Sequence, residues 1–497
     1  MKCIFFFVIA SFSLFYAEII HVPADQPTIQ DGINEASNGD TVLVADGVYT
    51  GFHNKTLSWN GNEKHLIVKS QNGPESCIID IEENGWGFRL LNMHQNSTDV
   101  IEGFTIKNSD KNAIFCENSS PTIRNNIIKN NISAGGCGIN LYSSNAHVYE
   151  NTIKENSAQP EVWPSFTYGA GIYIMYGSPE IYHNIIMDNE IYQGDGGGIF
   201  VAHSNAIIRN NLIINNYDSG ISTHQDGYEP YFLIIENNTI INNEHHGILI
   251  HKNGSIKNNI IMYNEIGLYN NDFVGIIGNN NVWNNDENYV NFPPDIGNMN
   301  WGININGTAC DSFFNISEDP LFSSSTEGNY FLSQLSSGQS IQSPCVDAGQ
   351  GFPVDYGLEE FTTRTDLEWD ENYVDIGFHY EGIEQVNFKE NLIPNYSFQI
   401  SNFPNPFNPS TTISFNVTQT SSFMTLGIYN LKGQKVKTLP VILSDAQHCI
   451  EGSGTANNYS VIWNGKDDNN KAIASGVYFA RLKAGNQEVT RKMLLMK

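Results

Sequence analysis

The sequence is poor in basic residues: 25 Lys and Arg stand against 53 Asp and Glu in 497 residues, a formal net charge of −28. Binding to nucleic acid or to an anionic membrane surface needs clustered Lys and Arg. The shortage therefore argues against both kinds of partner. Only 16% of the residues are charged and 40% are hydrophobic, so the chain is not an acidic disordered tail either.

Cysteine is also scarce. The seven Cys residues are scattered and form no CxxC motif, which excludes a zinc knuckle and a dithiol redox site of the usual spacing. Disulfides form readily in exported proteins. The first pair to test is Cys310 with Cys345.

Long hydrophobic runs are absent beyond the N-terminus. Lys2 is followed by the apolar run CIFFFVIASFSLFYA, which ends near Ala17 and predicts a secretory signal peptide over residues 1–17. The bulky Phe15 leaves the cleavage point open. No other stretch approaches the ~18 apolar residues of a membrane-spanning helix, so we expect no transmembrane segment in the mature chain.

The central part of the sequence has no helical periodicity but contains a short motif that is repeated along the chain. The pattern I-x-x-N-x-I-x-x-N recurs, with small substitutions, every 21 to 33 residues. Its first Asn is found at Asn126, Asn151, Asn184, Asn211, Asn238, Asn259 and Asn280. A Gly with apolar residues at +1 and +3 accompanies the copies, as in GIYI from Gly171 and GIFV from Gly198.

Such a repeat is too short to close a hydrophobic core alone, but coils stacked at roughly 4.8 Å share one. The sequence therefore predicts an all-β fold: a parallel β-helix, right-handed because parallel crossover connections are. We expect the repeated Asn residues to occupy the turns, tolerate the left-handed conformation and stack as an amide ladder.

The remaining segments fit around these coils. Residues 18–50 are interpreted as an N-terminal cap, with a short helix that begins at Thr28 and covers the open strand edges. Regular coils are expected over about 98–290. Residues 291–385 lose the Asn repeat and are interpreted as distal coils and a cap, followed by a linker over 386–402.

The coils, together with DPLF at 319–322 and SPCVDAG at 343–349, resemble secreted right-handed β-helix proteins of the pectin-lyase-like fold. The resemblance covers about residues 18–385. It implies a relation to carbohydrate-binding proteins and sugar hydrolases. Because this fold carries lyases, hydrolases, esterases, epimerases and non-catalytic surface proteins, it predicts the fold more sharply than the function.

The C-terminal 95 residues differ in composition. Residues 403–497 carry +5, and removing this and Lys2 from the total leaves −34 on residues 18–402. Short alternating strands predict a small Ig-like β-sandwich. The segment resembles the C-terminal sorting domain of type IX secretion cargo, through FPNPFNP (403–409), NLKGQKV (430–436), WNGKDDNN (463–470) and the basic end. The resemblance implies secretion to, or beyond, the outer surface of a Gram-negative-type bacterium, with the type IX machinery as partner.

The signatures of the known chemistries of the fold are missing. A lyase needs a calcium cage of carboxylates and a base, and a hydrolase needs paired Asp residues; neither cluster is present in a recognisable form. An acidic turn such as Gly194-Asp195-Gly196 leaves Ca²⁺ as a candidate cofactor, with no ligand set assigned. Whether the protein is an enzyme stays open.

The strongest candidate site lies on coils 170–252, where three insertions border the Gly-Ile strand. His–Asp sets transfer protons or hold metals, and aromatic faces suit sugar rings. The candidate catalytic residues are Asp195, His203, His224, Asp226 and His251. The candidate carbohydrate-binding residues are Trp163, Tyr168, Tyr173, Phe200 and Tyr228.

These observations predict a monomeric, exported β-helix protein that binds a polysaccharide. The ligand is neutral, or acidic and held through Ca²⁺, because the solenoid itself is acidic. Two alternatives stay open: a polysaccharide lyase or glycoside hydrolase acting on the 170–252 face, and a structural or adhesive solenoid without catalytic activity.

Overall fold

The structure is a computed structural model that describes residues 17–59, 64–92, 98–160, 166–224, 231–326, 328–382, 400–417, 424–430, 432, 434–439, 457–468, 471–484 and 487–496. Residues 1–16 of the predicted signal peptide and most of the predicted linker lie outside these residues. The chain divides into two compact units, Met1–Val386 and Asn387–Lys497, and each is described by itself.

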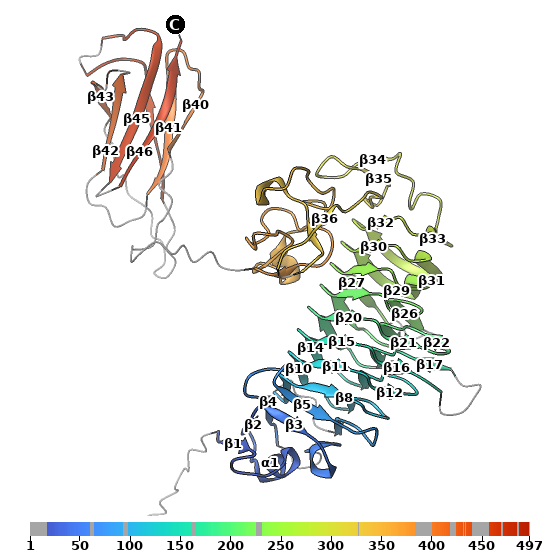
Figure 1. Ribbon diagram of the computed structural model, residues 1–497. Helices are drawn as coiled ribbons and strands as arrows, with labels where there is room; N and C mark the ends of the chain where they lie inside the picture. Colours follow the sequence, from blue (N-terminus) through green and yellow to red (C-terminus); the bar gives the residue numbers. More distant parts are fainter. Residues whose placement is uncertain are drawn as a thin grey trace, which may run out of the picture. The chain divides into compact units, whose positions relative to one another are not determined.

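The first unit is a parallel β-helix, as the repeat predicts (Figure 1). Its largest sheet contains 18 strands, which we call the large sheet. These strands are β1 (Ile19–Val22), β2 (Thr41–Val44), β4 (Ile67–Ser70), β6 (Phe88–Leu91), β7 (Val100–Glu102), β9 (Ile114–Glu117), β10 (Thr122–Arg124), β13 (Ile139–Tyr142), β14 (His147–Tyr149), β18 (Ile172–Met175), β19 (Glu180–Tyr182), β23 (Ile199–Ala202), β24 (Ile207–Arg209), β26 (Ile221–His224), β27 (Leu233–Glu236), β29 (His246–Lys257), β31 (Ile266–Gly278) and β33 (Glu287–Val290).

A second sheet of 10 parallel strands closes the other side of the coils. These strands are β3 (Gly47–Tyr49), β5 (Cys77–Asp80), β8 (Thr105–Lys107), β11 (Ile127–Lys129), β15 (Thr152–Lys154), β20 (Ile185–Met187), β25 (Leu212–Ile214), β28 (Thr239–Ile241), β30 (Ile260–Met262) and β32 (Asn281–Trp283). Two small parallel sheets lie in the loops: β12 (Ile132–Ser133), β16 (Ser157–Ala158) and β21 (Glu190–Ile191), and β17 (Thr167–Tyr168) with β22 (Gly194–Asp195).

Two buried asparagine ladders run through the turns, which confirms the predicted amide stacking. In the first, each Asn Nδ2 donates to Oδ1 of the next coil at 3.0 Å, through Asn126, Asn151, Asn184, Asn211, Asn238, Asn259, Asn280 and Asn315. The second runs from Asn131 to Asn288 with distances of 2.9 to 3.1 Å. The left-handed residue is not the ladder Asn but the one before it, such as Asn125 (φ 51°) or Glu150 (φ 56°).

The glycines of the Gly-Ile motif have a steric reason. A Cβ on Gly171 or Gly138 would lie 2.5 Å from the carbonyl oxygen of the equivalent Gly in the next coil, closer than real contacts allow. The next coil approaches the backbone at this position, so only glycine fits.

The N-terminal cap contains the predicted helix, α1 (Ile29–Glu35), followed by a short 3-10 turn, η1 (Phe52–Asn54). The Thr28 side chain accepts a hydrogen bond from the Asp31 backbone N–H and thereby caps the helix. Ile29 and Ile33 are fully buried and join the continuous core that runs through the coils.

The segment after residue 316 folds back along the side of the solenoid. Asn210 Nδ2 donates to the His379 carbonyl at 2.9 Å, and Asn258 Oδ1 accepts from the Gln350 backbone N–H at 2.8 Å. Its apolar residues cover the outward side chains of β25, β28 and β30 in one buried cluster. Two short strands, β34 (Gly302–Ile303) and β35 (Ala309–Cys310), lie just before the fold-back. The folded-back segment contains β36 (Phe322–Ser323), β37 (Phe331–Leu332), η2 (Leu335–Ser337), η3 (Pro353–Tyr356), β38 (Phe361–Thr362) and β39 (Tyr380–Glu381).

The expected Cys310–Cys345 disulfide is wrong. Both residues belong to the buried cluster under the folded-back segment, and both are free thiols. The Cys345 sulfur lies 3.1 Å from Asn281 Nδ2, which satisfies it without a covalent partner. Cys77, Cys116 and Cys137 are also buried and free.

The second unit consists of two antiparallel sheets, as predicted for a small β-sandwich. One sheet contains β40 (Ile400–Phe403), β41 (Thr411–Val417) and β44 (Asn457–Trp463). The other contains β42 (Met424–Asn430), β43 (Lys435–Leu439), β45 (Gly476–Ala484) and β46 (Gln487–Leu495). Both sheets contribute to one core, in which Trp463 and Phe407 pack with ring centroids 5.4 Å apart.

Candidate functional site

The Gly-Ile strands of the large sheet align their outward side chains in one row. Parallel pairing in register places Asn140 opposite Tyr173, Tyr173 opposite Phe200, and Phe200 opposite Ser222. The row continues toward the N-terminus through Phe115 and Arg89. Adjacent members belong to adjacent coils, so the row runs across the strands at about 4.8 Å per step.

A groove of about 370 Å³ lies beside the N-terminal half of this row. It is lined by Trp86, Lys111, Asn112, Ser133, Ala134, Gly135, Asn140, Tyr168 and Tyr173. Asn140 Oδ1 is buried and has no hydrogen-bond partner among the described residues. The groove thus combines flat aromatic faces with polar groups, as sugar-binding sites do.

Three of the predicted aromatic residues come together: Tyr168 and Tyr173 line the groove, and Phe200, which is buried, packs against both. Tyr168, on the strand pair β17–β22, lies 4.6 Å from the Phe200 ring, and Tyr173 stacks on Phe200 at 5.7 Å with only 5° between the planes. Burial raises the pKa of Tyr173, which keeps its phenol protonated. Trp163 and Tyr228 lie outside the described residues.

Sequence reasoning missed Trp86, which lines the far end of the groove. The Arg89 guanidinium lies 4.8 Å from its ring centroid. Trp86 precedes Gly87-Phe88-Arg89-Leu90, a copy of the Gly-Ile pattern that lies upstream of the Asn repeat. Phe88 and Leu90 are fully buried at the +1 and +3 positions, so this spacing could have extended the row by two coils.

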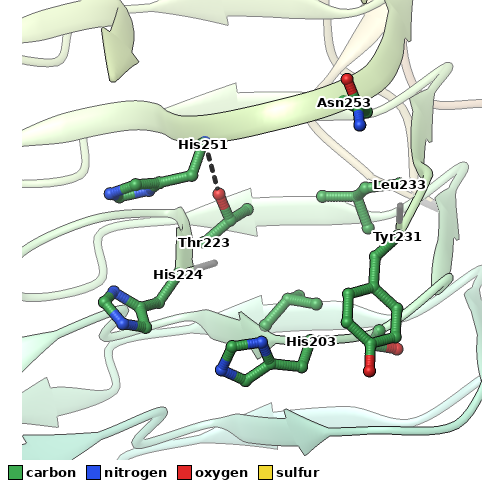
Figure 2. A pocket seen from close by; sticks show the side chains of 9 residues that line it. His203, Thr223, His224, Tyr231, Leu233, His251 and Asn253 are labelled. Carbon is green, nitrogen blue, oxygen red and sulfur yellow. Dashed lines mark hydrogen bonds between the residues drawn. The ribbon is translucent and has the colours of Figure 1, made fainter. Parts of the chain in front are cut away.

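Three of the predicted catalytic residues lie side by side on consecutive coils (Figure 2). The ring centroids of His203 and His224 are 6.2 Å apart, and those of His224 and His251 are 5.6 Å apart. Tyr231 packs against His203 at 5.9 Å. The hollow that these rings line measures only about 20 Å³, room for about one water molecule.

The backbone and the neighbouring coils hold this histidine row in place. The His251 N–H donates to Thr223 Oγ1 at 2.8 Å, as Figure 2 shows, and His251 Nε2 lies 2.7 Å from Asn271 Nδ2. At the other end, Tyr176 stacks on His203 at 5.7 Å. These contacts fix the histidine row, in which His224 is exposed and His203 and His251 are half-buried.

Asp195 lies on β22 and is paired with Tyr168 of β17, a residue of the groove lining. Part of the surface of Asp195 is exposed. Partial burial of its carboxyl, and secondly the negative charge of Asp218, raise the pKa of Asp195, while His224 lowers it. Asp226, the fifth predicted catalytic residue, lies outside the described residues. Within the part of the chain that the structure describes, no group of three or more His, Cys, Asp or Glu is placed to hold a metal ion.

The comparisons with known proteins support the architecture. The family described as "Right handed beta helix region" matches residues 20–184 and 165–290, and the "Secretion system C-terminal sorting domain" matches residues 401–496. The sorting domain directs export to the cell surface or the extracellular space. No helix among the described residues is long and apolar enough to cross a membrane.

No curated protein matches the sequence. Among solved structures, the alginate lyase AlyGC of the PL6 family is 13% identical, with a TM-score of 0.27; the match covers 64% of this chain and 56% of the enzyme. A variant of the same enzyme matches equally. This chain thus spans little more than half the length of the structures it matches.

Proposed function

Because the chain belongs to the right-handed β-helix family and ends in a secretion sorting domain, we propose that it is an exported protein that binds a polysaccharide in the groove between Trp86 and Tyr173. The observation that carries this proposal is the groove itself. Its volume of about 370 Å³ suits a short stretch of glycan, and its lining provides three aromatic rings with amide, hydroxyl and ammonium groups.

The aromatic residues would supply most of the affinity. A pyranose ring presents an apolar face of C–H groups, which stacks on an aromatic ring, and its hydroxyls then point to the sides. In this proposal the Asn140 side chain and the Lys111 ammonium of the lining would exchange hydrogen bonds with such hydroxyls. In the groove, the net acidity of the chain favours a neutral glycan, or an acidic one bridged by Ca²⁺.

The test is a glycan array with the full exported chain, with and without Ca²⁺, followed by affinity measurements for Tyr173→Ala. We expect about a tenfold loss of affinity, equivalent to roughly 1.4 kcal/mol. Tyr149→Ala is the matched control, because Tyr149 stacks on Tyr182 at 4.8 Å in a different row of the large sheet. Absence of binding to every glycan, or equal losses for both variants, would contradict the proposal.

The histidine row favours a second candidate, a lyase or hydrolase activity toward the bound glycan. His224 and His251 lie on strands of the same sheet as the groove row, and His203 directly follows β23 of that sheet. Asp195 is paired with Tyr168 of the groove lining. In this candidate His224 and Asp195 exchange protons with the glycosidic bond or the adjacent carbon. The test is product release from each bound glycan: His224→Ala should abolish it and leave binding intact. Binding without any product leaves the non-catalytic adhesive role.

A further inference from the structure

The second sheet carries a column of three lysines on its outward face. Register pairing places Lys107 of β8 opposite Lys129 of β11, and Lys129 opposite Lys154 of β15. They occupy consecutive coils, so their backbones are about 4.8 Å apart. We call these three residues the lysine column. It lies on a different sheet from the groove row.

The column is unusual for this chain, because residues 18–402 contain only 14 Lys and Arg but carry a net charge of −34. Like charges directly opposite each other on neighbouring strands destabilise a sheet. At its ends the column has carboxylate partners: Lys107 lies 3.1 Å from Asp80, and Lys154 lies 3.3 Å from Glu155. Lys129, in the middle, makes no ion pair with any residue of the described part of the chain.

The fold-back leaves this part of the sheet uncovered. In the next coils, the position in register with the lysines is occupied by apolar residues, on which the folded-back segment packs: Met187, Ile214, Ile241 and Met262. The apolar members of the position are therefore covered by the chain itself. The cationic members face solvent, with side chains 28% exposed at Lys107 and 30% exposed at Lys154.

We propose that the lysine column binds an anionic polysaccharide, one that carries carboxylate or sulfate groups along a linear chain. A linear polymer laid along the solenoid axis would present its charged groups to successive coils. Lys129 would pair directly with one charged group of the polymer. Lys107 and Lys154 would exchange their ion pairs with Asp80 and Glu155 for the neighbouring charged groups of the polymer. Thr152 and Asn130 flank the column and offer hydroxyl and amide groups to the sugar.

This partner fits better than nucleic acid. Three lysines on a strongly acidic solenoid cannot replace the dense counterion layer of a nucleic acid duplex. A polysaccharide with one charge per sugar is less highly charged. It also offers neutral hydroxyls that hydrogen-bond beside the column. The sorting domain takes the chain to the outside of the cell, where such polymers are met.

The experiment measures binding of the full exported chain to immobilised polygalacturonate (carboxylate), dextran sulfate (sulfate) and uncharged dextran. Binding to one or both charged polymers is expected, and it should weaken steeply between about 0.05 and 0.5 M salt. Lys129→Gln should weaken it about two- to fivefold, and the Lys107, Lys129 and Lys154→Gln triple variant at least about tenfold.

The control variant is Lys69→Gln with Lys257→Gln, two half-buried lysines on the outward face of the large sheet. It removes similar charge elsewhere and should bind as the native chain does. Tyr173→Ala should also retain this binding, which separates the lysine column from the groove. Native binding to neither charged polymer, unchanged binding of the triple variant, equal loss in the control, or tighter binding to duplex DNA would overturn the proposal.

Discussion

His379 Nε2 lies 3.1 Å from a carboxylate oxygen of Asp370, and both side chains, which belong to the folded-back segment, are almost completely buried. The other ring nitrogen, Nδ1, lies 2.9 Å from the Gly377 carbonyl, which only accepts hydrogen bonds. Nδ1 must therefore carry a proton. The Nε2–Asp370 contact then requires one further proton, held either by the carboxyl or by the ring.

Burial, and secondly the charge of Asp347, raise the pKa of Asp370 to about 7, while the N–H of Asp375 opposes the rise. Burial lowers the pKa of His379. The two directions agree: the shared proton resides on Asp370, which donates to a neutral imidazole. Asp375, fully buried nearby, accepts from Gln334 and Thr363, and burial raises its pKa well above the usual range.

We predict that the first unit is less stable at pH 8 than at pH 5. A carboxyl whose pKa is raised in the folded state stabilises it fully below the unfolded value near 4, and this stabilisation is lost as the pH rises through about 7. Burial lowers the pKa of His183, His246 and His379, and these groups act oppositely below about pH 6.5. The carboxyls whose pKa burial raises outnumber them: Glu150, Asp195, Glu236, Asp347, Asp370 and Asp375. Thermal unfolding followed from pH 5 to 8 measures the slope.

Asp370→Asn tests the origin of that slope. An Asn amide donates to His379 Nε2 as the protonated acid does, but its nitrogen cannot accept the Asp375 N–H that the same Asp370 oxygen receives. The variant should therefore be less stable than the native chain near pH 5 and should lose less stability than the native chain between pH 5 and pH 8. The matched variant His379→Asn removes the acceptor and should be destabilised throughout. A native unfolding temperature that does not change from pH 5 to 8 contradicts the prediction.

The asparagine ladders should be highly sensitive to substitution. Asn211 Oδ1 accepts from the Asn184 backbone and side chain, and its Nδ2 donates to Asn238 and Ile181, all within the buried interior. Asn211→Ala leaves several of these groups unsatisfied and should cost about 3–5 kcal/mol in the free energy of unfolding. Asn130→Gly, at an exposed left-handed position, should stay within about 0.5 kcal/mol. Denaturant unfolding measures both, and similar losses would disprove the role of the ladder.

A methyl group added to a glycine of the Gly-Ile motif should push neighbouring coils apart. On Gly198 it would lie 2.4 Å from the Gly220 carbonyl oxygen, a backbone atom that cannot move alone. We expect Gly198→Ala to destabilise the first unit by about 1–3 kcal/mol or more. Gly302 has open space at the same point, so Gly302→Ala is the matched control and should be neutral. Calorimetry of the two variants decides.

The buried thiols should be unreactive in the native protein. Burial raises the pKa of Cys77, Cys137 and Cys345 to about 12 in each case, so almost no thiolate is present at neutral pH. Alkylation followed by mass spectrometry should label none of the five described cysteines natively and all five after unfolding. A Cys310–Cys345 cross-link in the peptide map would contradict this.

The repeat made the β-helix predictable because each Asn and each Gly performs the same task in every coil. The spacing that places Asn126 and Asn151 in one ladder also places Lys129 and Lys154 in one column. The column can therefore be predicted from the sequence of the strand that follows each Asn. The repeat predicts that the ladder Asn adopts the left-handed conformation, but the residue before it does. The Asn side chain forms the ladder, and the preceding residue makes the turn.

The fold-back was not predictable by the same reasoning, since its contacts repeat nowhere. Asn210 and Asn258 precede ladder residues and look like ordinary turn residues, yet their side chains hold the backbone of His379 and Gln350. Nothing in local spacing connects residues so far apart in the sequence. Trp86 was missed for a related reason: its coil lacks the Asn that marks the others.

The same hydrogen bond between Asn210 and His379 joins residues 169 positions apart. A solenoid of nearest-neighbour contacts folds and unfolds coil by coil, in any order. Here the middle coils acquire their outer cover only when the last residues of the unit pack against them. Folding therefore includes a slow, non-local closing step, and partial opening at either end of the coil stack is coupled to the middle.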